Sequence, residues 1–126
     1  MKNLLMICGL LIMFSSCYND KADKLYVQPN TTTCDTTNVT YSGTVNPIIQ
    51  ANCANSASCH NASGAALSGY DFTSYAGLSQ AVHNNDVVSI LQHTSTLPAM
   101  PLNAAKLADC DIQKIAIWVN AGALQN

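Results

Sequence analysis

The sequence predicts an all-α fold built from short helices, on three observations. Polar residues that favour helix N-caps precede short apolar runs at Asn46, at Thr73 or Ser74, and at Asp86. Residues 109–122 have the periodicity of an amphipathic helix that ends at a glycine. Glycine and proline bound each of these segments, and segments of this length are consistent with compact helical packing.

The first helix is expected to start at Asn46, which offers a cap oxygen, with Pro47 at the first helical position. It continues through Ile48 and Ile49 and leads into Cys53. After His60 we expect a loop of small residues over 61–69. The next helices follow the caps at Thr73 or Ser74 and at Asp86, although periodicity alone also allows residues 87–91 to be a strand.

The C-terminal helix is the best defined of these elements. Asp109 and Asp111 lie in its first turn, where carboxylates favour the helix dipole, and Gly122 stands where a C′ glycine would end it. The apolar stripe comprises Ile112, Ile115, Ala116 and Val119, broadened by Ile117 and Trp118.

The N-terminus has the features of a secretion signal. Residues 1–16 combine a positive Lys2 with an apolar core too short to span a bilayer, and Phe14-Ser15-Ser16-Cys17 resembles a lipobox. We predict a lipoprotein signal peptide at 1–16 and acylation of Cys17, with an ordinary signal cleaved nearby as the alternative. Residues 17–33 then form a flexible tether, and 34–126 one small domain.

Composition limits the class of partner. The chain has five lysines and seven aspartates, with no arginine and no glutamate, which argues against nucleic acid and against a polybasic membrane patch. Without Cys8 and Cys17, four cysteines remain for an exported domain. They allow two disulfides, or one disulfide and two thioethers to a haem.

The segment Cys53 to His60 carries the strongest chemical signal. A Cys-x-x-Cys-His motif marks c-type haem attachment, in which two thiols bond the haem and the adjacent imidazole ligates iron. Here the spacing is Cys-x5-Cys-His, so the spacer 54–58 must bulge, which its small residues tolerate. The alternative is a disulfide between Cys53 and Cys59, with His60 an ordinary polar residue.

Over residues 40–124 the chain resembles the small monohaem cytochrome c domains of bacterial lipoproteins. The matching features are Val45-Asn46-Pro47-Ile48-Ile49 before Cys53, then Cys59-His60, Tyr70-Asp71-Phe72, Met100-Pro101, and Asp111 to Gly122 with Trp118. The resemblance implies a cytochrome c-like fold around a haem cleft, with haem c held covalently through Cys53 and Cys59.

The same resemblance implies His60 and Met100 as axial ligands of the iron. Met100 lies between Pro98 and Pro101, which restrict its loop, although methionine is also a common core residue. His83 and His93 are the rival ligands. We expect His60 and Met100 to face each other across an apolar cleft with the two cysteines at its edge. The expected wall of this cleft comprises Ile48, Leu91, Ile115 and Val119.

Cys34 and Cys110 are predicted to form a disulfide that joins the start of the domain to the last helix. A link from Cys34 to Cys53, or from Cys59 to Cys110, would instead count against haem attachment.

The function expected from these features is single-electron transfer by an exported cytochrome on the cell envelope. Its partners are redox proteins at the membrane, with the membrane reached through the lipid anchor. Neither nucleic acid nor a small-molecule substrate is expected, and the protein is not expected to be an enzyme. If Met100 left the iron open, a haem enzyme such as a peroxidase would be the alternative. The competing class is a haem-free lipoprotein binding module stapled by disulfides.

Overall fold

The computed structural model describes residues 33–126, and every regular element in this range is helical. The all-α prediction is confirmed, and residues 87–91 are a helix rather than a strand. The elements in chain order are the π-helical turn η2 (Tyr41–Val45) and the α-helices α3 (Asn46–Asn52), α4 (Ala65–Ser68), α5 (Tyr75–Asn84), α6 (Val87–Leu91) and α7 (Asp109–Asn120).

The first helical segment begins earlier than expected. Thr40 caps it, because its hydroxyl oxygen accepts a hydrogen bond from Gly43 N at 3.1 Å. The turn η2 runs directly into α3, so Asn46 already has helical dihedral angles and is not an N-cap. The Asn46 side chain instead accepts a hydrogen bond from Gln50 Nε2 at 3.1 Å. The predicted cap on Asn46 is therefore wrong.

Two other predicted caps are confirmed. Ser74 Oγ accepts from Gly77 N at 3.3 Å at the start of α5, and Asp86 Oδ1 accepts from Ser89 N at 3.1 Å at the start of α6. The expected loop 61–69 contains one short element, α4, which the sequence did not indicate. With four residues, α4 is too short to show a helical period.

Helix α7 has both predicted carboxylates in its first turn and buries Ile112, Ile115 and Trp118. It ends as expected near Gly122, which has a φ of 93° and donates its N–H to Val119 O at 3.0 Å. Ala116 and Val119 are only half-buried. Trp118 faces the centre of the core, where its ring centroid lies 5.8 Å from that of Tyr41.

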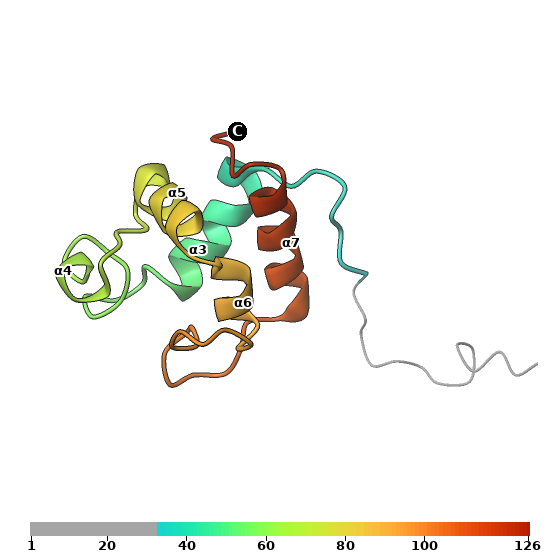
Figure 1. Ribbon diagram of the computed structural model, residues 1–126. Helices are drawn as coiled ribbons and strands as arrows, with labels where there is room; N and C mark the ends of the chain where they lie inside the picture. Colours follow the sequence, from blue (N-terminus) through green and yellow to red (C-terminus); the bar gives the residue numbers. More distant parts are fainter. Residues whose placement is uncertain (1–32) are drawn as a thin grey trace, which may run out of the picture. The chain divides into compact units, whose positions relative to one another are not determined.

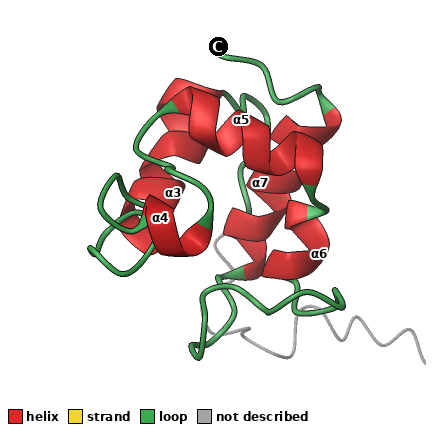
Figure 2. Ribbon diagram, turned by 60° about the vertical axis from the view of Figure 1, so that its left-hand side comes forward, coloured by secondary structure: helices red, strands yellow, loops and turns green. Residues whose placement is uncertain are grey.

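The core is formed where α7 packs against η2 and α6. Helix α4 and the loops beside it lie at one side of the domain and α7 at the other (Figure 1). The turned view separates the long loop between α6 and α7 from the helices above it (Figure 2). The C-terminus is fixed close to η2, because Ser42 N donates to Asn126 O at 2.9 Å.

A disulfide joins Cys34 to Cys110, whose Cα atoms lie 5.4 Å apart, so this pairing is confirmed. It connects the extended start of the domain to the first turn of α7. In the chain-entropy account, closing a loop of this length stabilises the fold by roughly 4.5 kcal/mol.

The predicted signal peptide at 1–16, the acylated Cys17 and the tether at 17–33, apart from Thr33, lie outside the described residues. Among the helices of residues 33–126, none has the length and apolar character needed to cross a bilayer.

Candidate functional site

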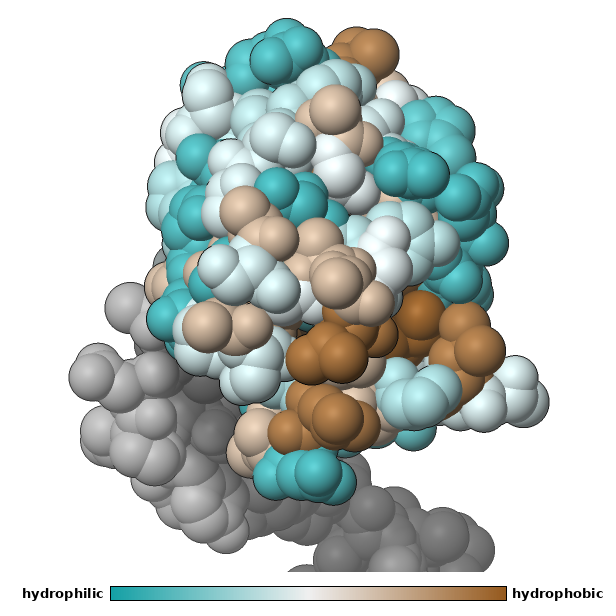
Figure 3. All heavy atoms as spheres, turned by 90° about the vertical axis from the view of Figure 1, so that its left-hand side faces the viewer, coloured by the Kyte–Doolittle hydropathy of each residue, from teal (hydrophilic) through white to brown (hydrophobic). Residues whose placement is uncertain are grey.

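An apolar pocket with a volume of about 170 Å³ lies among the helices. Ile49 of α3, Leu78 and Ala81 of α5, and Leu91 of α6 form much of its wall. Seen from the side of α4, strongly hydrophobic residues gather in a patch low on this face of the molecule (Figure 3). The domain therefore contains an apolar cavity that its own side chains do not fill.

Three of the four predicted haem-binding residues line this pocket, namely Cys53, His60 and Met100. They come from two parts of the chain, since Cys53 and His60 lie between α3 and α4 and Met100 lies in the loop before α7. The fourth, Cys59, does not line the pocket. Its sulfur accepts a hydrogen bond from Ser56 Oγ at 2.9 Å.

Residues 53–72, which we call the histidine side, hold His60 through its main chain and its ring. His60 N donates to Cys53 O at 2.9 Å, and His60 O accepts from Phe72 N at 2.7 Å. The imidazole stacks on the Phe72 ring, with centroids 4.2 Å apart and planes 11° from parallel. Phe72 is itself 8% exposed, so the ring under His60 is part of the core.

The imidazole of His60 is arranged as a neutral ligand. Its Nδ1 lies 3.4 Å from Tyr70 O, and because a carbonyl only accepts, Nδ1 is the donor. The lone pair of the neutral ring is then on Nε2. Burial lowers the pKa of His60 below its ordinary value, and the hydrogen bond to Tyr70 only partly offsets this effect.

Close packing also fixes the chain beside His60. A Cβ added at Gly64 would lie 1.8 Å from Cys59 O and 2.9 Å from Ala57 O. Only glycine allows α4 to approach the Cys53–His60 segment this closely. The turn is completed by Asn61, whose side-chain oxygen accepts from Gly64 N at 2.8 Å.

Cys53 and Cys59 are both free thiols, and neither is fully buried. The alternative disulfide between them is not formed in this structure. Burial, with a smaller contribution from the neighbouring Cys59, raises the pKa of the Cys53 thiol to about 11. Cys53 is therefore a neutral thiol at the edge of an apolar cavity.

Residues 92–106, which we call the methionine side, are packed more loosely. None of these residues is buried, although Leu97, Pro98 and Met100 line the pocket. Met100 is half-buried and its N–H donates to Ile90 O at 3.4 Å. Leu97 is 46% exposed, so it belongs both to the lining and to the surface.

The two rival histidines do not line the pocket. His83 is exposed on α5, where its Nδ1 donates to Ser79 O at 2.7 Å, a local contact within the helix. His93 is also exposed and its Nε2 lies 3.1 Å from Met100 O. Neither side chain is placed to share a ligand bound in the pocket with His60.

Three polar residues also line the pocket, namely Ser68, Tyr70 and Asn85. Asn85 Nδ2 donates to Tyr70 Oη at 2.9 Å, and Ser68 Oγ donates to Tyr70 O at 3.0 Å. The phenolic proton of Tyr70 is therefore free to donate to a ligand. Sequence reasoning missed Ser68 and Asn85, and the only signal for Asn85 was its position just after a predicted helix.

The expected pocket wall was only partly right. Leu91 lines the pocket, but Ile49 takes the place expected for Ile48. Ile115 and Val119 do not line it, because α7 packs its buried face against η2 and α6. Helix α7, which the sequence defines best, therefore does not line the pocket.

Comparison with known proteins adds no family to this description. No protein-family model matches the chain, and no curated protein or solved structure matches it. Within residues 33–126, no group of three or more His, Cys, Asp and Glu side chains is arranged to hold a metal ion by itself. The pocket offers an imidazole, a thioether and a thiol around an apolar cavity.

Proposed function

We propose that this protein is a lipid-anchored c-type cytochrome that carries single electrons, with haem bound in the apolar pocket. One observation carries the proposal: Met100 lines the same pocket as Cys53 and His60 although it follows His60 by 40 residues. The resemblance named these residues from short motifs alone. Their convergence on one apolar cavity does not follow from the motifs.

The donor set suits haem iron. His60 would supply Nε2, since Nδ1 is engaged with Tyr70 O, and this arrangement orients an imidazole ligand and fixes its tautomer. Met100 would supply a thioether, which favours ferrous iron and raises the reduction potential. Haem bound there would supply the exchange of one electron between ferrous and ferric iron.

The size of the cavity requires one part of the chain to move. An engineered cavity of about 150 Å³ accepts a benzene ring, and a porphyrin is several times larger than benzene. The pocket of about 170 Å³ must therefore widen to enclose a porphyrin. The methionine side is the segment expected to move outward, since none of its residues is buried.

Covalent attachment would use the two free thiols. Cys53 already lines the pocket, whereas Cys59 would have to give up its hydrogen bond from Ser56. A second requirement is a partner for the haem propionates in a chain without arginine. The free phenolic proton of Tyr70 supports its role as such a donor, with Asn85 holding the hydroxyl in place.

The same assignment favours a carrier over an enzyme. If His60 and Met100 both bound the iron, no coordination position would be left for a substrate. We propose redox proteins at the membrane as the partners and acylated Cys17 as the anchor on the cell envelope. If Met100 did not bind, the open position would allow peroxidase chemistry instead.

The experiment is to express the full chain in a bacterial host with a c-type maturation system. A Soret band and a pyridine haemochrome spectrum with one haem per chain are expected. His60→Ala should lose the haem, and His83→Ala is the matched control that should keep it. A colourless wild-type protein would contradict the proposal and favour the haem-free module, with the pocket taking a small apolar ligand.

Two further variants separate the remaining alternatives. Met100→Ala should keep the haem but bind carbon monoxide, with a potential lower by on the order of 100 mV, within the roughly 0.8 V that axial ligands span. Carbon monoxide binding to the wild type would favour the enzyme. Cys17→Ser should release the protein from the membrane fraction, and equal retention of this variant would rule out the anchor.

A further inference from the structure

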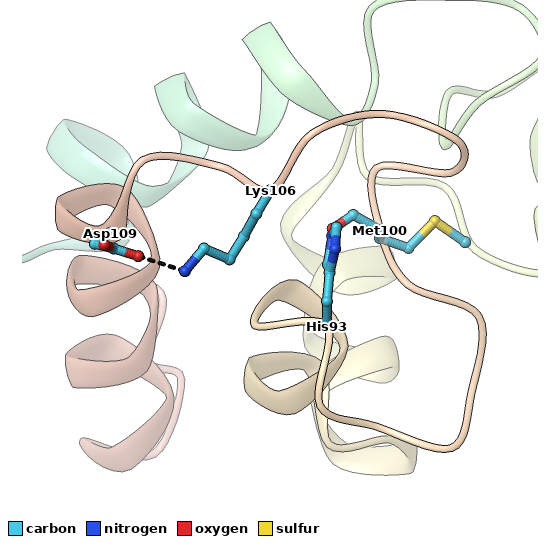
Figure 4. A network of polar contacts seen from close by, with 4 residues as sticks. All are labelled: His93, Met100, Lys106 and Asp109. Atoms are coloured by element: carbon cyan, nitrogen blue, oxygen red, sulfur yellow. Dashed lines mark hydrogen bonds and ion pairs between the residues drawn. The ribbon is translucent and has the colours of Figure 1, made fainter.

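His93 lies just after α6, and its side chain contacts the main chain of Met100 seven residues later. The distance from His93 Nε2 to Met100 O is 3.1 Å. Because the carbonyl oxygen only accepts, Nε2 is the donor. The close view shows the imidazole beside the main chain of Met100, while the thioether extends away from it (Figure 4).

The backbone of His93 directs its side chain across the loop. His93 N donates to Ile90 O at 3.2 Å, which ends the helical turn. Its φ of 60° lies in the left-handed region, which residues other than glycine seldom adopt. The chain reverses at this residue, so residues 94–99 form a loop that returns to His93 at Met100.

Both main-chain groups of Met100 are therefore hydrogen-bonded. Its N–H donates to Ile90 O at 3.4 Å and its C=O accepts from His93 Nε2 at 3.1 Å. None of the residues 92–106 is fully buried, and the half-buried Met100 side chain packs against the edge of the core. Met100 and His60 therefore each have two main-chain hydrogen bonds, but only the His60 side chain also stacks on a buried ring.

We infer that His93 is a positioning residue that fixes Met100 at the pocket, rather than a rival ligand. The inference rests on the proposed function in one respect: its expected consequence is that the Met100 thioether stays bound to the iron. The hydrogen bond between His93 and Met100 does not itself depend on haem. His93 does not line the pocket, and its Nε2 is engaged by a carbonyl.

The test compares His93→Ala with His93→Gln and with His83→Ala in the full chain. Glutamine can donate from its side-chain amide near the position of Nε2, so it should restore the contact. His83 is an exposed histidine that does not contact Met100, which makes it the matched control. The haem-loaded proteins are compared by carbon monoxide binding to the ferrous state and by reduction potential.

In His93→Ala we expect faster carbon monoxide binding by about two- to tenfold, the factor that one net hydrogen bond gives, and a lower potential. His93→Gln should return both values toward the wild type, and His83→Ala should change neither. If His93→Ala matches the wild type in both measurements, His93 does not position the ligand.

A second measurement uses the same variants without haem. Hydrogen exchange at the Met100 amide should be about two- to tenfold faster in His93→Ala than in the wild type. If the wild type binds no haem, the proposed function fails, but this measurement still decides whether His93 holds Met100. An unchanged exchange rate in His93→Ala would overturn the inference in either case.

Discussion

The histidine side and the methionine side approach the same pocket but are built in different ways. On the histidine side, His60 has both main-chain groups bonded, and its ring stacks on the buried Phe72. On the methionine side, no residue is buried, and Met100 is tied to the end of α6 by two hydrogen bonds. Both predicted ligands are half-buried, but His60 also stacks on a buried ring, whereas Met100 lies in a segment without a buried residue.

This difference follows from the residues available to each side. The histidine side has Phe72 stacked on the imidazole, Tyr70 stacked on Phe72, and Gly64 to allow close approach of the chain. The methionine side has no aromatic residue between Thr94 and Lys106, and Leu102 is 61% exposed. Under strain or ligand entry, the methionine side is expected to open first and the histidine side to stay in place.

The largest effect is expected from removing the disulfide, which lies outside both sides. The double variant Cys34→Ser with Cys110→Ser should lose roughly 4.5 kcal/mol of unfolding free energy, because a loop of this length is released in the unfolded chain. Urea unfolding measures the loss, and amide exchange at His60 and Met100 reports on the two sides. Selective loosening of one side would show that the disulfide supports the pocket directly.

The next effect is expected on the histidine side. Phe72→Ala should cost about 3 kcal/mol, near the lower end for a buried phenylalanine because this ring also faces the pocket. The imidazole of His60 would lose its stacking partner as well. Phe72→Leu is the control and should cost about 1 kcal/mol. Equal stability of Phe72→Ala and the wild type in urea would mean that stacking does not fix this side.

Gly64 gives a sharper test of close packing. Gly64→Ala should cost about 2 kcal/mol, because the added Cβ overlaps the Cys59 carbonyl and the chain must shift. Gly69→Ala is the matched control at the other end of α4, where no atom lies within 4 Å of the added Cβ. Its cost should be about 1 kcal/mol, from the φ of 78° alone. Equal costs in urea unfolding would show that close packing at Gly64 does not hold α4 against the Cys53–His60 segment.

Much of the helical framework could be predicted because its signals are local. The caps at Ser74 and Asp86 and the end of α7 at Gly122 depend on residues a few positions apart. The start of the first helix could not be predicted in the same way. The turn η2 precedes Asn46, so the helical segment begins at Tyr41, and in α3 it is Ile49 rather than Ile48 that lines the pocket.

Several residues of the candidate site could be predicted from the sequence, but their arrangement in space could not. Short motifs singled out Cys53, His60 and Met100, yet nothing local determines that Cys59 lies outside the pocket lining. Its orientation depends on how the five-residue spacer bulges and on the hydrogen bond from Ser56. The role of His93 likewise depends on a left-handed residue and a loop closure that only three-dimensional structure reveals.

The smallest effect is expected on the surface of the methionine side. Leu102→Ala should change the unfolding free energy by no more than about 0.5 kcal/mol, because this leucine is 61% exposed. Leu107→Ala is the matched control just beyond the same loop, where the leucine is 7% exposed and its loss should cost about 3 kcal/mol. Urea unfolding of the two variants compares the stability contributed by an exposed leucine with that contributed by a buried leucine five positions later. If Leu102→Ala cost as much as Leu107→Ala, the methionine side would be packed like the histidine side, and its opening to admit a porphyrin would be too costly to expect.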